Sequence, residues 1–130
     1  MTVDPTPDHK ALLAACLAQP AAFPTDRFDG RGIVICAGGV RMFTCAWVLL
    51  WMLRSELGCR LPIQLWHLGA AELSPAMRRL LTAFDVELVD AEAVKARNPA
   101  RIEDGWQLKP FALMHSRFAE VLLLDADQVP

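Results

Sequence analysis

The chain has 130 residues, of which 54% are hydrophobic and 22% charged, and its formal net charge at pH 7 is −2. This length suits one globular unit with a single core. The apolar content excludes an intrinsically disordered chain, and the slight negative charge predicts neither a nucleic-acid partner nor an acidic membrane surface as a partner.

The first part of the chain, residues 1–30, is expected to form an N-terminal helix and a connecting segment. Met1 to Pro7 is polar and acidic instead of basic and then apolar, which predicts no signal peptide and a cytoplasmic protein. Asp8 can cap a helix over residues 8–18, whose apolar side we expect to pack on the rest of the domain. Prolines, Asp and Gly within residues 19–31 predict a surface connection.

Residues 31–130 alternate between two kinds of pattern. Short apolar runs predict strands at residues 32–37, 62–68, 86–89 and 120–125, and helical patterns occupy residues 43–57, 74–84 and 110–118, with one helical turn at 91–97. This alternation predicts an α/β fold, a Rossmann-like parallel sheet with flanking helices. The longest apolar run, residues 42–53, would extend about 18 Å as a helix, which is too short for a bilayer core of about 30 Å. We therefore expect no membrane span.

Three aromatic side chains are assigned to the core, and the cysteines are assigned no metal. Phe43, Trp47 and Trp51 recur at helical spacing, which favours packing in the core over an exposed stacking surface. The four cysteines are scattered without a CxxC pair, so we interpret them as reduced structural thiols instead of zinc ligands.

The loop after the first strand is the first candidate contact for a ligand. In a parallel sheet all strand-to-helix loops collect at the carboxyl edge, where ligands bind. Ala37, Gly38 and Gly39 lie in this loop, and the two glycines equally suit a turn that needs a positive φ. The sequence that follows is Val-Arg-Met, which does not complete a GxGxxG fingerprint and disfavours a dinucleotide-binding Rossmann domain.

Two carboxylates carry the clearest chemical signal. Asp125 and Asp127 end the apolar strand at 120–125, where burial without a cation or polar partner would be costly. Hard oxygen donors at this spacing suit Mg²⁺ or Mn²⁺, and either ion can in turn hold a diphosphate. The alternative interpretation is a solvated turn after a strand.

Lys109 is the candidate cation at the same edge. Pro110 suits the first turn of a helix, which predicts that Lys109 lies at the helix start, where an anion is favoured. An exposed lysine that covers apolar surface with its stem is the alternative. Trp106 is expected in the loop ahead of the helix, either packed beneath that loop or forming a wall of the pocket.

The run from Gly105 to Leu113, with the run from Glu120 to Asp127, resembles the α-mannosyltransferases related to the fungal Golgi mannosyltransferases. More distantly these runs resemble glycogenin and other retaining enzymes with a DxD motif. The resemblance extends from about Phe28 to the end of the chain. It implies a GT-A fold, in which residues 31–130 are the nucleotide-sugar-binding half, incomplete at the C-terminus.

The resemblance also implies an activity. It is the transfer of a hexose, mannose above all, from GDP-mannose or a UDP-sugar to a hydroxyl of a carbohydrate or other acceptor, with retention and with Mn²⁺ or Mg²⁺. Asp125 would contact the donor ribose and the metal, Asp127 the metal, and Lys109 the donor sugar or phosphate. Ala37 to Gly39 would lie against the nucleotide. Because a third metal ligand and an acceptor region are expected beyond Pro130, the 130 residues alone are expected to be inactive.

Two other functions fit the same residues. A haloacid-dehalogenase-like phosphatase also places DxD after an apolar strand, with Asp125 as the nucleophile. That motif normally opens its domain, whereas here three strand and helix pairs precede it. A non-catalytic nucleotide-binding domain with the same fold is the second alternative.

Overall fold

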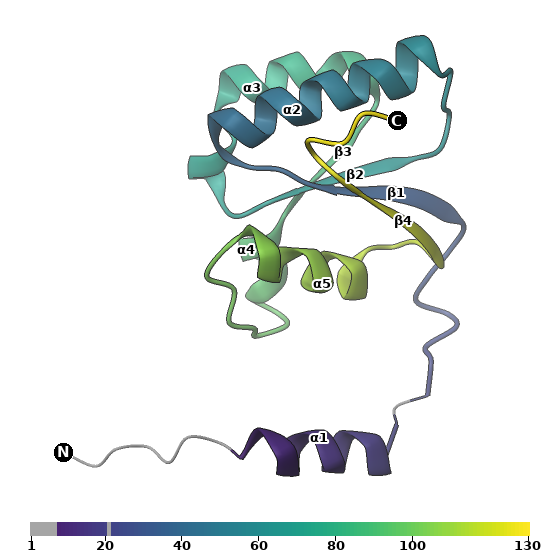
Figure 1. Ribbon diagram of the computed structural model, residues 1–130, viewed down its shortest axis with the longest axis vertical. Coiled ribbons are helices and arrows are strands. Elements are labelled where there is room, and N and C mark those ends of the chain that lie inside the picture. The colour runs from purple at the N-terminus through teal and green to yellow at the C-terminus, as the bar shows by residue number, and fades with distance from the viewer. Residues whose placement is uncertain (1–7, 21) are drawn as a thin grey trace, which may run out of the picture.

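The computed structural model describes residues 8–20 and 22–130, and its centre is a four-stranded sheet (Figure 1). The strands are β1 (Arg31–Cys36), β2 (Ile63–His67), β3 (Glu87–Asp90) and β4 (Glu120–Asp125). Every neighbouring pair is parallel. The predicted α/β class with a parallel sheet is therefore confirmed. Met1 to Pro7, where no signal peptide is expected, lies outside the described residues.

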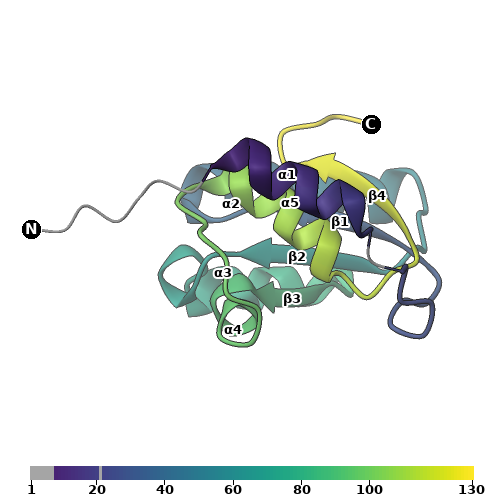
Figure 2. The ribbon, with the colours of Figure 1, turned by 90° about the horizontal axis from the view of Figure 1, so that it is seen from below.

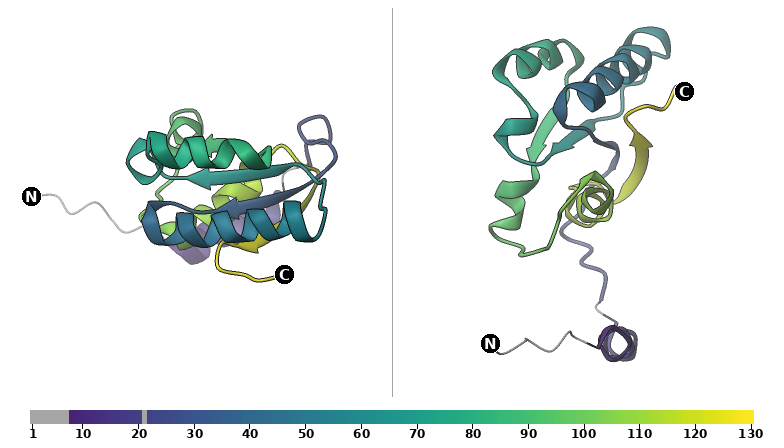
Figure 3. Two further views of the ribbon diagram at one scale, coloured as in Figure 1. Left: turned by 90° about the horizontal axis from the view of Figure 1, so that it is seen from above. Right: turned by 60° about the vertical axis from the view of Figure 1, so that its left-hand side comes forward.

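Helices cover both faces of the sheet (Figures 1 and 3). One face carries α2 (Gly39–Trp51) with its π-helical continuation η1 (Met52–Glu56), and α3 (Pro75–Leu81) with the short η3 (Thr82–Phe84). The other face carries α4 (Ala91–Lys95) and α5 (Gly105–His115). The remaining helices are α1 (His9–Ala18) and η2 (Ala70–Glu72). Among the described residues no helix has both the length and the apolar character of a membrane span.

The alternation of side chains along β1 explains the two layers. Ile33 and Ile35 join the apolar cluster beneath α2 and α3, whereas Val34 and Cys36 join the cluster beneath α4 and α5. Because successive side chains of a strand point to opposite faces, a strand that is apolar throughout needs a cover on each face. The continuous apolar run of the first strand thus requires helices on both sides.

The strand order β3-β2-β1-β4 decides where a crevice can form. The chain moves from β1 outward through β2 to β3, and then returns past β1 to place β4 on its other side (Figure 2). The helices after β1 and before β4 therefore lie on opposite faces of the sheet. Such a reversal of strand order opens a crevice at the carboxyl ends of the two strands. Here that position lies between β1 and β4.

The N-terminal helix differs from the expectation. Asp8 does cap α1, because its carboxylate accepts hydrogen bonds from two backbone amides of the first turn. However, no residue of α1 is buried, so the predicted packing on the rest of the domain is wrong. Its apolar residues are four alanines, three leucines and Cys16, which are spread around the helix and form no single stripe that a core could cover.

The start of α5 also differs from the expectation of a helix over residues 110–118. The helix begins at Gly105, and Asp104 caps it by accepting hydrogen bonds from the backbone amides of Trp106 and Gln107. Pro110 lies inside the helix, although it has no amide for the bond that position normally donates. The stabilisation from the aspartate cap and from the apolar residues packed on the sheet exceeds the cost of this one missing hydrogen bond.

Only part of the aromatic assignment is confirmed. Phe43 is buried in the core, and Trp47 packs against that core edge-on to Phe84. Trp51, in contrast, is 42% exposed, so its assignment to the core is wrong. The helical face that carries Trp51 turns away from the sheet near the end of α2, where the helix passes into the wider π-helical turn.

Candidate functional site

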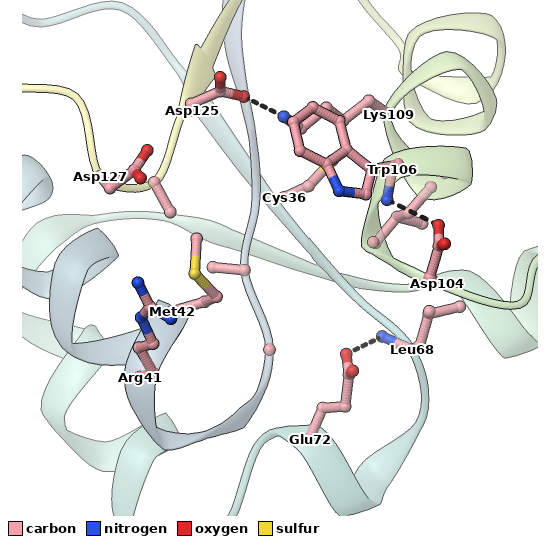
Figure 4. Close-up of a pocket in the computed structure, with 15 residues that line it drawn as sticks. Cys36, Arg41, Met42, Leu68, Glu72, Asp104, Trp106, Lys109, Asp125 and Asp127 are labelled. Atoms are coloured by element: carbon pink, nitrogen blue, oxygen red, sulfur yellow. Dashed lines mark hydrogen bonds and ion pairs between the residues drawn. The ribbon is translucent and has the colours of Figure 1, made fainter.

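A pocket of about 560 Å³ lies at the carboxyl ends of β1 and β4, at the point where the strand order reverses (Figure 4). Five of the residues predicted to bind donor or metal contribute to its lining, namely Ala37, Gly38, Lys109, Asp125 and Asp127. They come from three separate stretches of the chain, and the fold brings them together. Ligands in open α/β sheets bind in this kind of crevice.

The register between β1 and β4 directs Asp125 toward α5. Asp125 is paired with Cys36 across the parallel ladder, so both side chains point to the same face of the sheet. On that face the Nζ atom of Lys109 forms an ion pair with Oδ1 of Asp125. The lysine side chain is 23% exposed and the aspartate side chain 44% exposed, so this pair is partly shielded from water.

Asp127 lies in the turn that follows β4. The backbone amide of Gln128 donates to the carbonyl oxygen of Asp125 at 3.0 Å, and the amide of Asp125 donates to Oε1 of Gln128 at 2.8 Å. These two bonds hold the turn in shape. Within residues 8–20 and 22–130 the Asp127 carboxylate forms no hydrogen bond or ion pair, which leaves it available at the pocket.

Lys109 and Trp106 together form one side of the pocket. Lys109 lies in the second turn of α5 and not at the helix start, so the expected help from the helix N-terminus does not apply. The Lys109 ammonium lies 4.3 Å from the centre of the Trp106 ring, close enough for a cation–π contact. Trp106 belongs to the first turn of α5 and is 77% exposed, so its expected place in a loop and its packing beneath that loop are both wrong.

The two glycines after β1 have different reasons to be glycine. Gly39 begins α2 with a φ of +70°, a conformation that favours glycine, and it does not line the pocket. Gly38 has an extended backbone, but a Cβ atom at this position would collide with the carboxylate of Glu72. Sequence patterns did not single out Glu72. The only available signal was an acidic residue shortly after the second strand, at the carboxyl edge of the sheet.

The donor set of the pocket is compatible with a hard divalent cation. Asp125, at the end of β4, and Asp127, two residues later in the turn, both supply carboxylate oxygens to the pocket lining. No cluster of three or more His, Cys, Asp or Glu residues suited to a metal occurs in the part of the chain that the structure describes. Mg²⁺ is commonly held by one or two carboxylates together with substrate phosphates and water. Two aspartates facing a pocket fit that pattern.

Cys36 lies between the ion pair and the apolar core. Burial raises the pKa of its thiol from the usual 9.0 to about 12; Lys109 lowers this pKa and Asp125 raises it, both by smaller amounts. At pH 8 such a rise reduces the thiolate fraction roughly a thousandfold relative to an ordinary thiol. Cys36 is therefore expected to be inert toward thiolate-specific reagents at neutral pH.

The measurement is alkylation with iodoacetamide at pH 8, followed by peptide mass spectrometry. The exposed Cys16 should be labelled within minutes, while Cys36 in the folded protein should remain unlabelled over hours. Equal labelling of Cys16 and Cys36 at pH 8 would contradict the burial of Cys36.

The raised pKa of Cys36 also affects stability. Because the folded state keeps the Cys36 proton up to a higher pH than the unfolded state, this group stabilises the fold below pH 9, and that contribution is lost as the pH rises toward 12.

Comparison with known proteins gives a consistent family. Residues 30–130 match the model of the family described as "Mannosyltransferase putative". The chain is also 29% identical over 124 residues to the alpha-1,2-mannosyltransferase MNN21 of Candida albicans. That alignment covers 85% of this chain and 18% of the relative, so the chain spans less than a fifth of that protein. No solved structure matches.

The family model covers the whole sheet and the pocket. It begins one residue before β1 and includes both aspartates of the DxD sequence, Lys109 and the glycines after β1. By contrast, α1 lies outside the matched region, in agreement with its lack of buried residues. The chain therefore belongs to this mannosyltransferase family.

Proposed function

We propose that the pocket binds a nucleotide-diphospho-mannose, as the donor site of a metal-dependent mannosyltransferase. Residues 31–130 would be the nucleotide-sugar-binding half of a GT-A-type domain. One observation carries the proposal: Asp125, Asp127 and Lys109 line one pocket at the carboxyl ends of β1 and β4, in a chain of a mannosyltransferase family. GDP-mannose is the proposed donor, and a UDP-sugar is the alternative.

The charges of the pocket support a metal-bound donor. Carboxylates outnumber cations in the pocket lining, where Glu72, Asp104, Asp125 and Asp127 face only Arg41 and Lys109. This excess of negative charge would repel a diphosphate, so a donor in this pocket needs a cation between its phosphates and Asp125 or Asp127. Mn²⁺ or Mg²⁺ would supply Lewis-acid stabilisation of the departing diphosphate. Asp127 would bind the ion, and Asp125 would contact both the ion and the donor ribose.

Lys109 has a defined role in this proposal. Its ammonium pairs with Asp125 and lies over Trp106, so it is held at the pocket by contacts on two sides. When the Asp125 carboxylate turns to a cation, the ammonium is free to donate to a phosphate or sugar oxygen. Positioned cations stabilise the charge that develops on a phosphoryl leaving group. Ala37 and Gly38 would form the surface against the nucleotide, because both residues line the pocket directly after β1.

The acceptor would be a hydroxyl of a carbohydrate or another molecule, and the α configuration of the sugar would be retained. Both points rest on the family resemblance, and no contact within the pocket assigns the acceptor. The haloacid-dehalogenase-like alternative receives no support from the family match. Binding of the nucleotide without turnover by the complete protein would instead indicate the non-catalytic nucleotide-binding domain.

Calorimetry tests the proposal directly. GDP and GDP-mannose should bind in the presence of Mn²⁺ or Mg²⁺, and their affinity should fall at least about tenfold when EDTA removes the metal, because the excess of carboxylates in the pocket then faces the phosphates without the metal ion. The same titration with UDP provides the comparison between bases. Equal affinity with and without metal would contradict the proposal.

A further inference from the structure

We propose that Glu72 recognises the base of the donor nucleotide and selects guanine over uracil. This inference rests on the proposed function, since it assumes that a nucleotide diphosphate occupies the pocket. It goes further because it assigns a residue to the choice of base. Glu72 lines the same pocket but comes from η2, at a different strand end from the DxD sequence.

The Glu72 carboxylate is held in one place. Its Oε2 atom accepts a hydrogen bond of 2.7 Å from the backbone amide of Leu68, immediately after β2. Its side chain also fills the space beside Gly38 that any larger residue would occupy. The Oε1 atom has no hydrogen-bond or ion-pair partner within residues 8–20 and 22–130. One carboxylate oxygen is thus fixed by the backbone while the other is available to a ligand.

The position of Glu72 in the pocket separates it from the phosphate region. Figure 4 shows Glu72 on the side opposite the ion pair of Asp125 with Lys109. If the diphosphate lies near Asp125 and Asp127, the nucleoside extends toward the other side of the pocket. A further carboxylate there cannot serve the phosphates, because like charges repel. It suits a neutral group that donates hydrogen bonds.

Guanine offers the donors that this carboxylate needs. Its Watson–Crick edge carries the N1 and N2 hydrogens side by side, and a carboxylate can accept both in a bidentate arrangement. The comparable edge of uracil has one N–H between two carbonyl oxygens, whose lone pairs would face the carboxylate. The same oxygen that accepts from Leu68 retains a second lone pair, so the backbone contact does not prevent base recognition.

The ribose hydroxyls are the other donors of a nucleotide. In dinucleotide-binding sheets an acidic residue after the second strand accepts hydrogen bonds from a ribose. Such a contact would strengthen the binding of every nucleoside diphosphate equally. The choice of ligands in the experiment must therefore separate a contact to the base from a contact to the sugar.

The experiment measures the affinity of the protein for GDP, IDP and UDP in Mn²⁺, for the wild type and for Glu72→Gln. IDP lacks only the 2-amino group of guanine. The wild type should bind GDP about tenfold more tightly than IDP, as expected for one charge-assisted hydrogen bond, and should prefer GDP to UDP by at least as much, because uracil lacks the paired donors. Glu72→Gln should weaken GDP binding about tenfold and leave UDP binding within about twofold.

Two further variants control the experiment. Glu56→Gln removes the same charge from an exposed site at the end of η1, outside the pocket lining, and should change no affinity. Gly38→Ala displaces the Glu72 carboxylate without changing the charge of the protein. Because Gly38 lines the pocket itself, the readout for this variant is the ratio of GDP to UDP affinity, which should fall as it does in Glu72→Gln. Thermal melts establish that each variant is folded.

Three results would overturn the inference. Equal affinity of the wild type for GDP and UDP would show that the base is not selected. An equal loss for GDP, IDP and UDP in Glu72→Gln, with 2′-deoxy-GDP unaffected by the substitution, would assign Glu72 to the ribose. Absence of binding by every nucleotide with metal present would overturn the proposed function itself and this inference with it.

Discussion

Asp127→Asn should abolish the metal-dependent binding of GDP while leaving the fold intact. The substitution replaces a carboxylate oxygen by a neutral amide at an exposed turn, and the Asp127 side chain makes no hydrogen bond or ion pair within the described residues. Loss of one of the two carboxylates proposed to bind the metal should weaken binding at least about 100-fold. The free energy of unfolding should change by less than about 1 kcal/mol, as for other surface sites.

Calorimetry in Mn²⁺ and a thermal melt measure the two effects separately. Asp26→Asn is a matched control, because Asp26 is an exposed carboxylate in the connecting segment and does not line the pocket. It should preserve both affinity and melting temperature. A variant at position 127 that melts at a much lower temperature, but below that temperature binds metal and GDP as the wild type does, would instead assign Asp127 a structural role.

Lys109→Met should change metal binding and donor binding in opposite directions. In the free protein the Lys109 ammonium competes with a cation for the Asp125 carboxylate. Its removal should strengthen the binding of Mn²⁺ alone by about tenfold, because the cation no longer displaces a positive charge. GDP-mannose binding at saturating Mn²⁺ should weaken roughly tenfold or more, because a charge-assisted contact to the donor is lost.

The control for this prediction is Lys95→Met. Lys95 also forms an ion pair with a carboxylate, that of Glu92, and its side chain is similarly shielded at 21% exposed, but it does not line the pocket. Neither Mn²⁺ nor GDP-mannose affinity should change in this variant. Isothermal titration with Mn²⁺ alone gives the affinity for the metal, and titration with GDP-mannose at a fixed Mn²⁺ concentration gives the affinity for the donor. A parallel fall in both affinities for Lys109→Met would indicate that the lysine merely supports the shape of the pocket.

Much of the fold follows from local patterns in the sequence. The apolar runs at residues 32–37 and 120–125 predicted the two strands that border the pocket, and both strands are present as β1 and β4. Ser74 caps α3 as its position before a proline indicates. The alternation of strand and helix then left only a parallel sheet as a compact arrangement, with its loops at one edge.

Local patterns misplaced the start of α5, because two signals competed. Pro110 is favoured at a first helical position, but Asp104 offers a side-chain cap six residues earlier, and the buried Leu108 extends the apolar face between them. Tertiary packing of that face against the sheet favours the longer helix in spite of the proline. Trp106 consequently belongs to a helical turn and projects from the rim of the pocket.

By itself the sequence determined the parallel α/β class, the strand that ends in Asp125 and the expectation that Ala37, Gly38 and both aspartates meet at one edge. Only the tertiary structure decided that β4 pairs with β1, because no local signal encodes which edge of a sheet the returning strand joins. That pairing aligns Asp125 with Cys36 and turns it toward Lys109. The fit of Glu72 beside Gly38 likewise depends on two loops that approach each other only in the folded chain. Steric contacts depend on distance in space, and the sequence alone does not say which distant residues become neighbours.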